Sequence, residues 1–174
     1  MIPLPGSIMQ IAYVVDDLAA AAERWVGLTD AGPFFVLPHL QLTEPRYRGA
    51  PTDLDCSIAL GYSGSMCVEL IEQHDDAPSV FRELTDKHGP GFHHWAIMTE
   101  DFDSGLERYV DAGHQPAFSG AVAIGGRFAY VDTVASLGGM IELIELTPKV
   151  GELFNFLADA ASAWDGKEPL RTFQ

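Results

Sequence analysis

Four polar side chains interrupt apolar, strand-like segments of the chain and are the first candidates for chemistry. Gln10 begins the segment QIAYVV, His94 lies in GFHHWAIM, Glu69 lies in MCVELIEQ and Glu142 lies in GMIELIEL. Burying such groups without partners is costly, so their positions indicate a shared function. Three oxygen donors and one imidazole suit a divalent cation of intermediate hardness, with coordination positions left for water or substrate. The residue types therefore predict a metal site, provided that the fold brings the four together.

A repeat within the chain relates these four positions. The segment MQIAYVVDDLAAAAERWVG matches part of GFHHWAIMTEDFDSGLERYVDAG, so that Gln10 falls on His94 and Asp17 on Asp101. At the far end of each copy MCVELIEQ matches GMIELIEL, which sets Glu69 on Glu142. The loops between the matched ends differ in length. Such a pattern is typical of a duplicated module.

Each copy predicts the same order of elements, a strand, a helix and three further strands. β-Branched and aromatic runs indicate the strands, while Asp17 or Asp16 in the first copy and Asp101 in the second are expected to begin the helices. The expected strands cover residues 10–15, 33–37, 55–62 and 66–73, then 92–98, 115–119, 127–133 and 140–146, and the expected helices cover 17–26 and 101–112.

Strand periodicity indicates how the four residues can meet. Successive side chains of a strand point to opposite faces, so Glu69 and Glu72, an odd number of residues apart, face opposite ways. The same holds for Glu142 and Glu145. Each module then offers one polar residue at the start of its first strand and one glutamate inside its last. If these strands are neighbours and both halves curve around one cleft, the four side chains converge.

The fold class that follows is α+β, with two tandem βαβββ modules forming a curved mixed sheet around a central cleft. The first module covers residues 1–75, a helical connector 76–91, the second module 92–148, and a C-terminal helix and tail 149–174. Apolar residues at spacings of three and four between Val150 and Trp164 predict an amphipathic helix packed on a sheet face or on a partner subunit. We expect a homodimer, and a tail after Trp164 that is loose or crosses to the partner.

Composition excludes several classes of partner. The 174 residues include 25 Asp and Glu against 10 Lys and Arg, for a formal net charge of −15. Such a surface repels phosphate backbones and anionic lipids, so we expect no nucleic-acid or membrane partner. Cys56 and Cys67 show neither zinc-finger nor disulfide-framework spacing. We find neither a signal-peptide pattern nor a spanning apolar run, and we therefore expect a cytoplasmic protein.

The order of elements, the DDL and EDF helix starts, the GFHHWAI segment and the VELIE and IELIE closing strands resemble the vicinal oxygen chelate superfamily. This superfamily includes glyoxalases, methylmalonyl-CoA epimerases, extradiol dioxygenases and bleomycin resistance proteins. The resemblance covers roughly residues 9–148 and looks closest to the glyoxalase-like branch near methylmalonyl-CoA epimerase. It implies that Gln10, Glu69, His94 and Glu142 hold a divalent ion, with Mn²⁺, Co²⁺, Ni²⁺, Fe²⁺, Mg²⁺ and Zn²⁺ not distinguished.

The resemblance also implies a reaction style. A metal-dependent isomerase, epimerase or lyase of this kind acts on a small oxygenated metabolite through a metal-stabilised enolate, and Glu142 and Glu69 are the carboxylates expected to move the proton. Tyr47, Arg48, Arg127 and Tyr130 are the candidate substrate-binding residues, since Arg48 can grip a substrate carboxylate.

One departure from the family pattern keeps alternatives open. The first-strand ligand is usually histidine, and here it is Gln10, whose amide oxygen coordinates more weakly than imidazole. The two-histidine, one-carboxylate iron triad of extradiol dioxygenases cannot be built from these four positions. One alternative is a metal-free small-molecule binding protein that resembles bleomycin resistance proteins. Another is a metal-free enzyme that uses a glutamate base in the same cleft.

Overall fold

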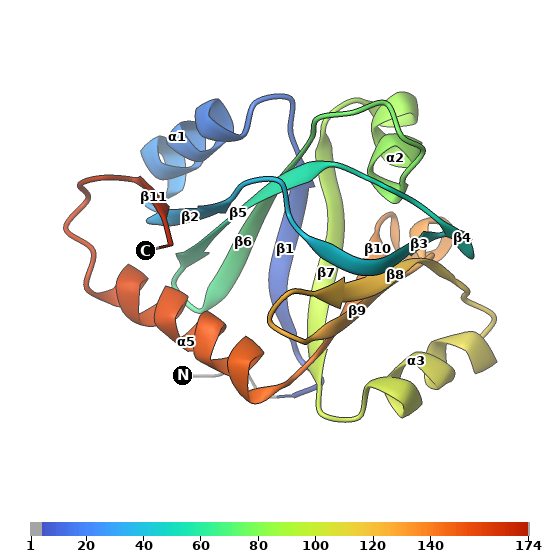
Figure 1. The fold of residues 1–174 in the computed structure, drawn as a ribbon. Coiled ribbons are helices and arrows are strands. Elements are labelled where there is room, and N and C mark those ends of the chain that lie inside the picture. The colour runs from blue at the N-terminus through green and yellow to red at the C-terminus, as the bar shows by residue number, and fades with distance from the viewer. Residues whose placement is uncertain (1–4, 174) are drawn as a thin grey trace.

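A computed structural model describes residues 5–173 of the chain. One curved, open, mixed sheet of eleven strands runs through the described part, in the order β11-β2-β5-β6-β1-β7-β10-β9-β8-β3-β4, with helices packed around it (Figure 1). The architecture is the predicted α+β class. The strands β1 (Ile8–Val14) and β7 (Gly91–Thr99) lie at the centre of the sheet and pair antiparallel.

The first repeat continues with α1 (Leu18–Thr29), β2 (Phe34–Leu37), β3 (Leu42–Tyr47), β4 (Ala50–Pro51), β5 (Cys56–Ser63) and β6 (Met66–Gln73). The connector holds α2 (Val80–His88). The second repeat contains α3 (Phe102–Asp111), β8 (Pro116–Val122), β9 (Arg127–Val131), α4 (Val134–Leu137) and β10 (Met140–Glu145). The chain then forms α5 (Pro148–Ser162) and β11 (Leu170–Thr172).

The two repeats pair their strands in the same way. In the first, β1 runs parallel to β6, which is antiparallel to β5, which is antiparallel to β2. In the second, β7 runs parallel to β10, which is antiparallel to β9, which is antiparallel to β8. Each return from a central strand to its parallel neighbour passes through a helix, as a parallel connection requires. The predicted helix starts are also confirmed, because Asp17 and Asp101 accept hydrogen bonds from Ala20 and Ser104.

Helices α1 and α3 cover the outer face of the sheet. In the first repeat, Ala21 and Ala22 of α1 pack with Phe34, Val68 and Leu70. Phe102 of α3 packs with Ala129 and Leu143 at the corresponding place in the second repeat. The alanine run of α1 lets the helix approach the sheet closely, since it presents no long side chain. The inner, concave face is left for the polar residues and for a cavity.

Two strands between β2 and β5 were missed by the sequence analysis. β3 and β4 lie in a polar stretch, and the proline at position 45 argues against a strand in the sequence. In the structure the backbone of Glu44 is left-handed (φ 48°), so β3 is irregular at this point. β3 nevertheless pairs with β8 of the second repeat, with a register shift between Thr43 and Arg46. Because β2 lies at the opposite end of the sheet, the segment between β2 and β3 crosses the concave side (Figure 1). The first repeat thereby contributes a strand to the far edge of the second.

A charged network fastens this crossing strand to the connector helix. The guanidinium of Arg48 donates to both carboxylate oxygens of Glu83, at 2.5 and 2.7 Å, and to Asp132 at 2.9 Å. The hydroxyl of Tyr47 also donates to Glu83. Hydrogen bonds from Arg48 are the main cause that lowers the pKa of Glu83 below its usual range. The guanidinium of Arg48, which directly follows β3, therefore links this strand to helix α2 and to the loop after β9.

The C-terminal prediction was right for the helix and wrong for the tail. Helix α5 packs on the inner face near β5, where Val150, Phe154 and Leu157 join Leu60 in a buried cluster. The sheet-face alternative is thus the one observed. The tail after Trp164 is not loose, because β11 pairs parallel with β2. Trp164 itself donates from its indole nitrogen to Lys167, which holds the turn that precedes β11.

No helix of residues 5–173 is both long enough and apolar enough to cross a membrane.

The network around Glu83 generates a prediction about stability. Replacing Glu83 with Gln should lower the free energy of unfolding at pH 7 by about 1 kcal/mol, a value kept small because Arg48 is 45% exposed. A glutamate with a lowered pKa stabilises the fold above the pKa of the unfolded chain, and this contribution disappears as the pH falls through the lowered value. Urea unfolding of both proteins at pH 7 and in acid measures the difference. The exposed substitution Glu107→Gln is the control, and an equal loss in acid and at pH 7 would contradict the role of charge.

Candidate functional site

The fold brings the four predicted side chains together on the concave face. Gln10 and His94 lie on the two central strands, while Glu69 and Glu142 lie on the strands that flank them, β6 and β10. All four are buried, with exposed fractions of 1%, 0%, 6% and 7% in that order. Two carboxylates, an imidazole and an amide thus share the base of a single concave surface.

The strand register explains how they meet. Glu69 pairs with Ala12, which pairs with His94, so these three residues form one row across β6, β1 and β7. In the same way Glu142 pairs with Ala96, which pairs with Gln10, and this second row crosses β10, β7 and β1. A fully buried alanine stands between the two polar residues of each row. Its methyl group leaves open the space above the sheet in which longer side chains converge.

Two bulges aim the central residues. Between the paired positions Ile8 and Gln10, β1 advances by two residues while β7 advances by one. Between His94 and Phe92, β7 advances by two residues while β1 advances by one. Met9 and His93 are therefore the extra residues, each directly before a predicted ligand. Bulges bend the strand locally and re-aim side chains. Both residues at each bulge, Met9 with Gln10 and His93 with His94, are consequently buried.

The polar atoms at the centre lie within a few ångströms of one another. Nε2 of His94 is 3.3 Å from Oε2 of Glu69 and 3.2 Å from Oε2 of Glu142. These are ion-pair distances, but neither contact has the direction of a hydrogen bond, and Nε2 of His94 has no hydrogen-bond partner among the described residues. The amide nitrogen of Gln10 donates to Glu69 at 3.0 Å, whereas its oxygen, also buried, has no such partner.

His93 determines which nitrogen of His94 faces the carboxylates. Nε2 of His93 lies 3.1 Å from the carbonyl oxygen of Val80, so it must carry a hydrogen and donate. Its Nδ1 then accepts from Nδ1 of His94, 3.0 Å away. Burial lowers the pKa of His93 to about 3, which keeps this ring neutral. In a neutral His94 the lone pair is accordingly on Nε2, which faces the two glutamates. A neutral imidazole with a free nitrogen lone pair is the form of histidine that ligates metals.

Charge and burial oppose each other at this centre. Burial raises the pKa of Glu69 above its usual range, the charge of Glu142 raises it further, and His94 opposes both. Burial lowers the pKa of His94, but the contacts with Glu142 and Glu69 outweigh it and raise this pKa to about 9. A proton and a metal ion would therefore compete for the same Nε2 lone pair, as is general for histidine ligands.

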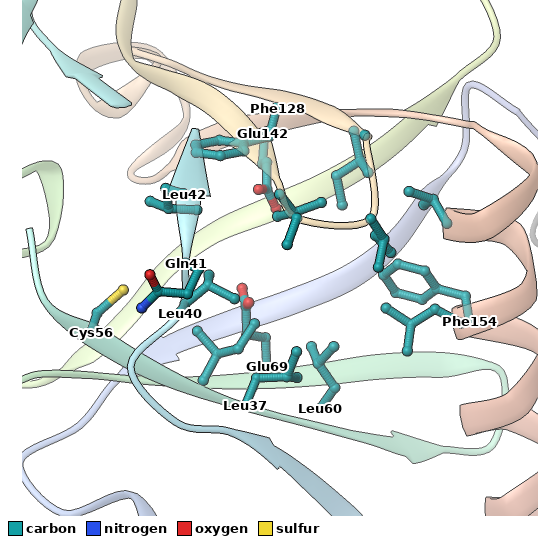
Figure 2. Close-up of a pocket in the computed structure, with 18 of the residues that line it drawn as sticks. Leu37, Leu40, Gln41, Leu42, Cys56, Leu60, Glu69, Phe128, Glu142 and Phe154 are labelled. Carbon is teal, nitrogen blue, oxygen red and sulfur yellow. The ribbon is translucent and has the colours of Figure 1, made fainter. Parts of the chain in front are cut away.

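A cavity of about 860 Å³ is lined by Gln10, Glu69 and Glu142, whereas the fully buried His94 is not among its lining residues. Figure 2 shows the carboxylates of Glu69 and Glu142 entering it from facing sides, with Leu42 and Phe128 on one side and Leu60 and Phe154 on the other. The thiol of Cys56 also lines it, and burial raises the pKa of this group to about 12, so it is uncharged. Neither cysteine forms a disulfide. The carboxylates are thus the polar focus of a largely apolar chamber.

The candidate substrate-binding residues occupy different places. Tyr130 lines the cavity and packs edge-on against the ring of His94, with centroids 4.8 Å apart. Burial, then the charges of Glu142 and Glu69, raise the pKa of Tyr130 well above its usual range. Arg127 lies at the cavity lining but its guanidinium is held by Glu145 and Asp103.

Tyr47 and Arg48 are not among the cavity-lining residues. Both are engaged by Glu83 in the network described above. A role in substrate binding stays a prediction for all four candidates.

His93 was missed as a functional residue, although the His-His pair was visible in the sequence. Strict alternation along a strand places His93 on the opposite face from His94, and the bulge reverses that expectation. Val80, its partner, contributes a backbone carbonyl, for which side-chain type carries no signal.

The donor set fits a divalent metal ion. Glu69, His94 and Glu142 each offer a ligand atom, and these atoms all lie within 4.8 Å of one another. The unpaired oxygen of Gln10 and the unpaired Nε2 of His94 are the kinds of buried atom that a cation would satisfy. Two carboxylates would neutralise the charge of a divalent ion, and His93 supplies the outer-shell hydrogen bond that ligating histidines usually have.

A second group of potential ligands lies apart from this centre. His39, Asp55 and His74 also bring ligand atoms within 4.8 Å of one another, but His39 and Asp55 are 65% and 42% exposed at their side chains. Nε2 of His74 is 2.6 Å from the hydroxyl of Ser57 and is already engaged. Any measurement of metal stoichiometry must separate this surface group from the buried one.

Solved structures of known proteins share the fold of this chain. Among solved structures, methylmalonyl-CoA epimerase from Mycobacterium tuberculosis superposes with a TM-score of 0.61 at 20% identity, covering 87% of this chain and 95% of that one. A hypothetical protein of Bacillus halodurans gives 0.59 at 20% identity, covering 81% and 94%. A methylmalonyl-CoA epimerase in complex with methylmalonyl-CoA gives 0.53 at 18% identity, covering 83% and 96%.

Sequence comparison addresses the family directly. No curated protein sequence matches the chain. Residues 9–130, which include most of both repeats, match the model of the glyoxalase, bleomycin resistance protein and dioxygenase superfamily. The chain belongs to the glyoxalase/bleomycin resistance protein/dioxygenase superfamily.

Proposed function

We propose that this protein is a metal-dependent isomerase or epimerase that moves a proton on a carbon next to an oxygen-bearing group of a small metabolite. The observation that carries the proposal is the unpaired buried Nε2 of His94, which lies within 3.3 Å of two buried carboxylates, together with the unpaired buried Oε1 of the neighbouring Gln10. Membership of the superfamily and the fold shared with methylmalonyl-CoA epimerases support the same reading.

In the proposed mechanism Gln10, Glu69, His94 and Glu142 hold the ion. When bound, a divalent metal supplies Lewis-acid stabilisation of the negative charge that develops on two adjacent substrate oxygens as a neighbouring carbon loses its proton. His93 fixes the orientation of His94 through the hydrogen bond between their Nδ1 atoms. The apolar walls of the cavity exclude water, which strengthens every electrostatic interaction at its base.

The glutamates are the proton carriers. Both carboxylates line the cavity, and a carboxylate placed beside the reacting carbon can accept and return a proton. Each carboxylate has two oxygens, so one can face the ion while the other faces the substrate. Glu69 and Glu142 enter the cavity from facing sides (Figure 2), which allows one to remove a proton and the other to return it on the opposite face. That sequence would invert the carbon, as an epimerase must.

Metal binding provides the first test. Saturating Mn²⁺ should raise the melting temperature by several degrees, since a ligand at about 100 times its Kd stabilises by roughly 2.7 kcal/mol. His94→Ala should abolish this shift, and Gln10→His should enlarge it, because imidazole is the stronger ligand. His74→Ala is the matched control in the surface group and should leave the shift unchanged. A shift that survives His94→Ala but disappears in His74→Ala would place the ion at the surface instead.

His93 provides a second test, aimed at the orientation of the ligand. His93→Phe keeps an aromatic ring between Phe81 and Tyr130 but removes the acceptor for Nδ1 of His94. Metal affinity should fall by roughly 10- to 100-fold, the usual effect of losing an outer-shell partner. Calorimetric titration with Mn²⁺ measures this, while circular dichroism of the metal-free variant checks its fold. An unchanged affinity in a folded variant would remove His93 from the site.

Proton exchange tests the chemistry itself. The metal-loaded protein in D₂O should exchange the proton on the hydroxyl-bearing carbon of acetoin, an uncharged compound whose two oxygens lie on adjacent carbons, and NMR follows this exchange. Glu69→Gln and Glu142→Gln should each slow this exchange by about 100-fold or more. Glu72→Gln and Glu145→Gln are the matched controls, since each lies on the same strand as its partner but outside the centre. Full exchange in both test variants, or in metal-free protein, would contradict the mechanism.

A further inference from the structure

We propose that the substrate carries its pair of adjacent oxygens on an uncharged apolar body, an alkyl chain or aromatic ring, and is not a coenzyme A thioester. The inference rests on the proposed function and adds to it the class of molecule that fills the cavity. The residues that carry it form the walls of the cavity, whereas the proposed metal ligands lie at its base.

The walls are apolar on both sides of the carboxylates. One wall comes from the second repeat, where Phe118, Phe128 and Tyr130 form a packed aromatic group with centroids 5.3 to 5.9 Å apart. The opposite wall comes from the C-terminal helix, which presents Leu153 and Phe154 (Figure 2 labels Phe154). A ligand whose oxygens meet Glu69 and Glu142 therefore extends over hydrocarbon in either direction.

The crossing segment between β2 and β3 adds to the same surface. Leu37, Leu40 and Leu42 of this stretch line the cavity, together with Ile58 and Leu60 of β5. A cavity of about 860 Å³ is within the range that encloses a drug-sized ligand. The volume greatly exceeds what two oxygens and the carbon beside them need, so most of a bound ligand would contact these side chains.

The cavity offers little to a polyanion. Coenzyme A carries several phosphate charges, and the cationic side chains among the described lining residues are Arg127 and Lys149, besides His39. Arg127 is occupied by two carboxylates, at 2.7 Å from Glu145 and 2.8 Å from Asp103. Lys149 lies one turn from Glu152, which lines the same cavity. The formal net charge of −15 opposes a phosphate-bearing ligand still further.

Alkyl hydroxamates test this inference, because they join two adjacent oxygens to a chain of adjustable length. Calorimetry of the Mn²⁺-loaded protein with acetohydroxamate, butanohydroxamate, hexanohydroxamate and octanohydroxamate should show the Kd falling roughly fourfold per added CH₂, which corresponds to about 0.8 kcal/mol for each buried methylene. Coenzyme A and methylmalonyl-CoA should give no measurable binding at concentrations that saturate the protein with octanohydroxamate.

Variants locate the chain in the cavity. Leu153→Gln replaces part of the helical wall, is partly exposed and should flatten the dependence of Kd on chain length without changing the Kd of acetohydroxamate. Leu137→Gln applies the same substitution at a residue that is 55% exposed and outside the cavity lining, and should behave as the unchanged protein. Equal effects of the two variants would contradict the assignment of the helical wall.

The two proposals fail in different ways. If acetohydroxamate does not bind the Mn²⁺-treated protein while affinity for 1-butanol, 1-hexanol and 1-octanol still rises with length, the metal-dependent function is wrong and the apolar pocket stands. If acetohydroxamate binds but chain length has no effect, the apolar body is wrong and the metal centre stands. Tighter binding of methylmalonyl-CoA than of octanohydroxamate would also overturn the inference.

Discussion

The structure depends on the burial of two carboxylates beside an imidazole and an amide at the base of one cavity. Glu69 and Glu142 are less than a tenth exposed, and each lies within 3.3 Å of Nε2 of His94. Removing such charges from water costs several kcal/mol per ion unless a cation or hydrogen bonds compensate. The chain meets part of this cost with Gln10 and with a raised pKa on His94. Oε1 of Gln10 and Nε2 of His94 are left without a hydrogen-bond partner among the described residues, and both are atom types that can ligate a cation.

Duplication is what makes this arrangement possible. Each repeat supplies one polar residue and one alanine from a central strand and one glutamate from the neighbouring strand. The antiparallel contact of β1 with β7 then sets each alanine between the glutamate of its own repeat and the central polar residue of the other. The matched bulges at Met9 and His93 serve the same end in both copies. They differ in chemistry, because His93 can orient His94 through a hydrogen bond whereas the thioether of Met9 cannot act in this way for Gln10. The centre is therefore symmetric in the positions of its residues and asymmetric in their hydrogen bonds.

The parts that depart from the repeat shape the cavity. Strand β3 leaves the first repeat and joins the edge of the second, which draws the leucines of the crossing segment over the concave face. Helix α5 follows the second repeat and returns to pack on the first, and β11 then extends the sheet next to β2. The repeated elements thus build the polar base and, through β5, β8 and β9, part of the apolar walls, and the unique elements complete those walls.

The sequence by itself indicated the duplication, the α+β class, the order of the repeated elements and the helix starts, at Asp101 and at either Asp16 or Asp17. It also named the four polar side chains that meet if their strands are neighbours around one cleft, because periodicity and internal matching can be read along the chain. Tertiary structure decided the rest. The strand around Pro45 forms because β8 offers it an edge, and the tail after Trp164 is ordered because β2 offers another. His93 turns inward because of a bulge that depends on how β1 and β7 are paired, and Arg48 is drawn to Glu83 by the crossing of β3. Each of these outcomes depends on a partner distant in sequence, whose position no local pattern encodes.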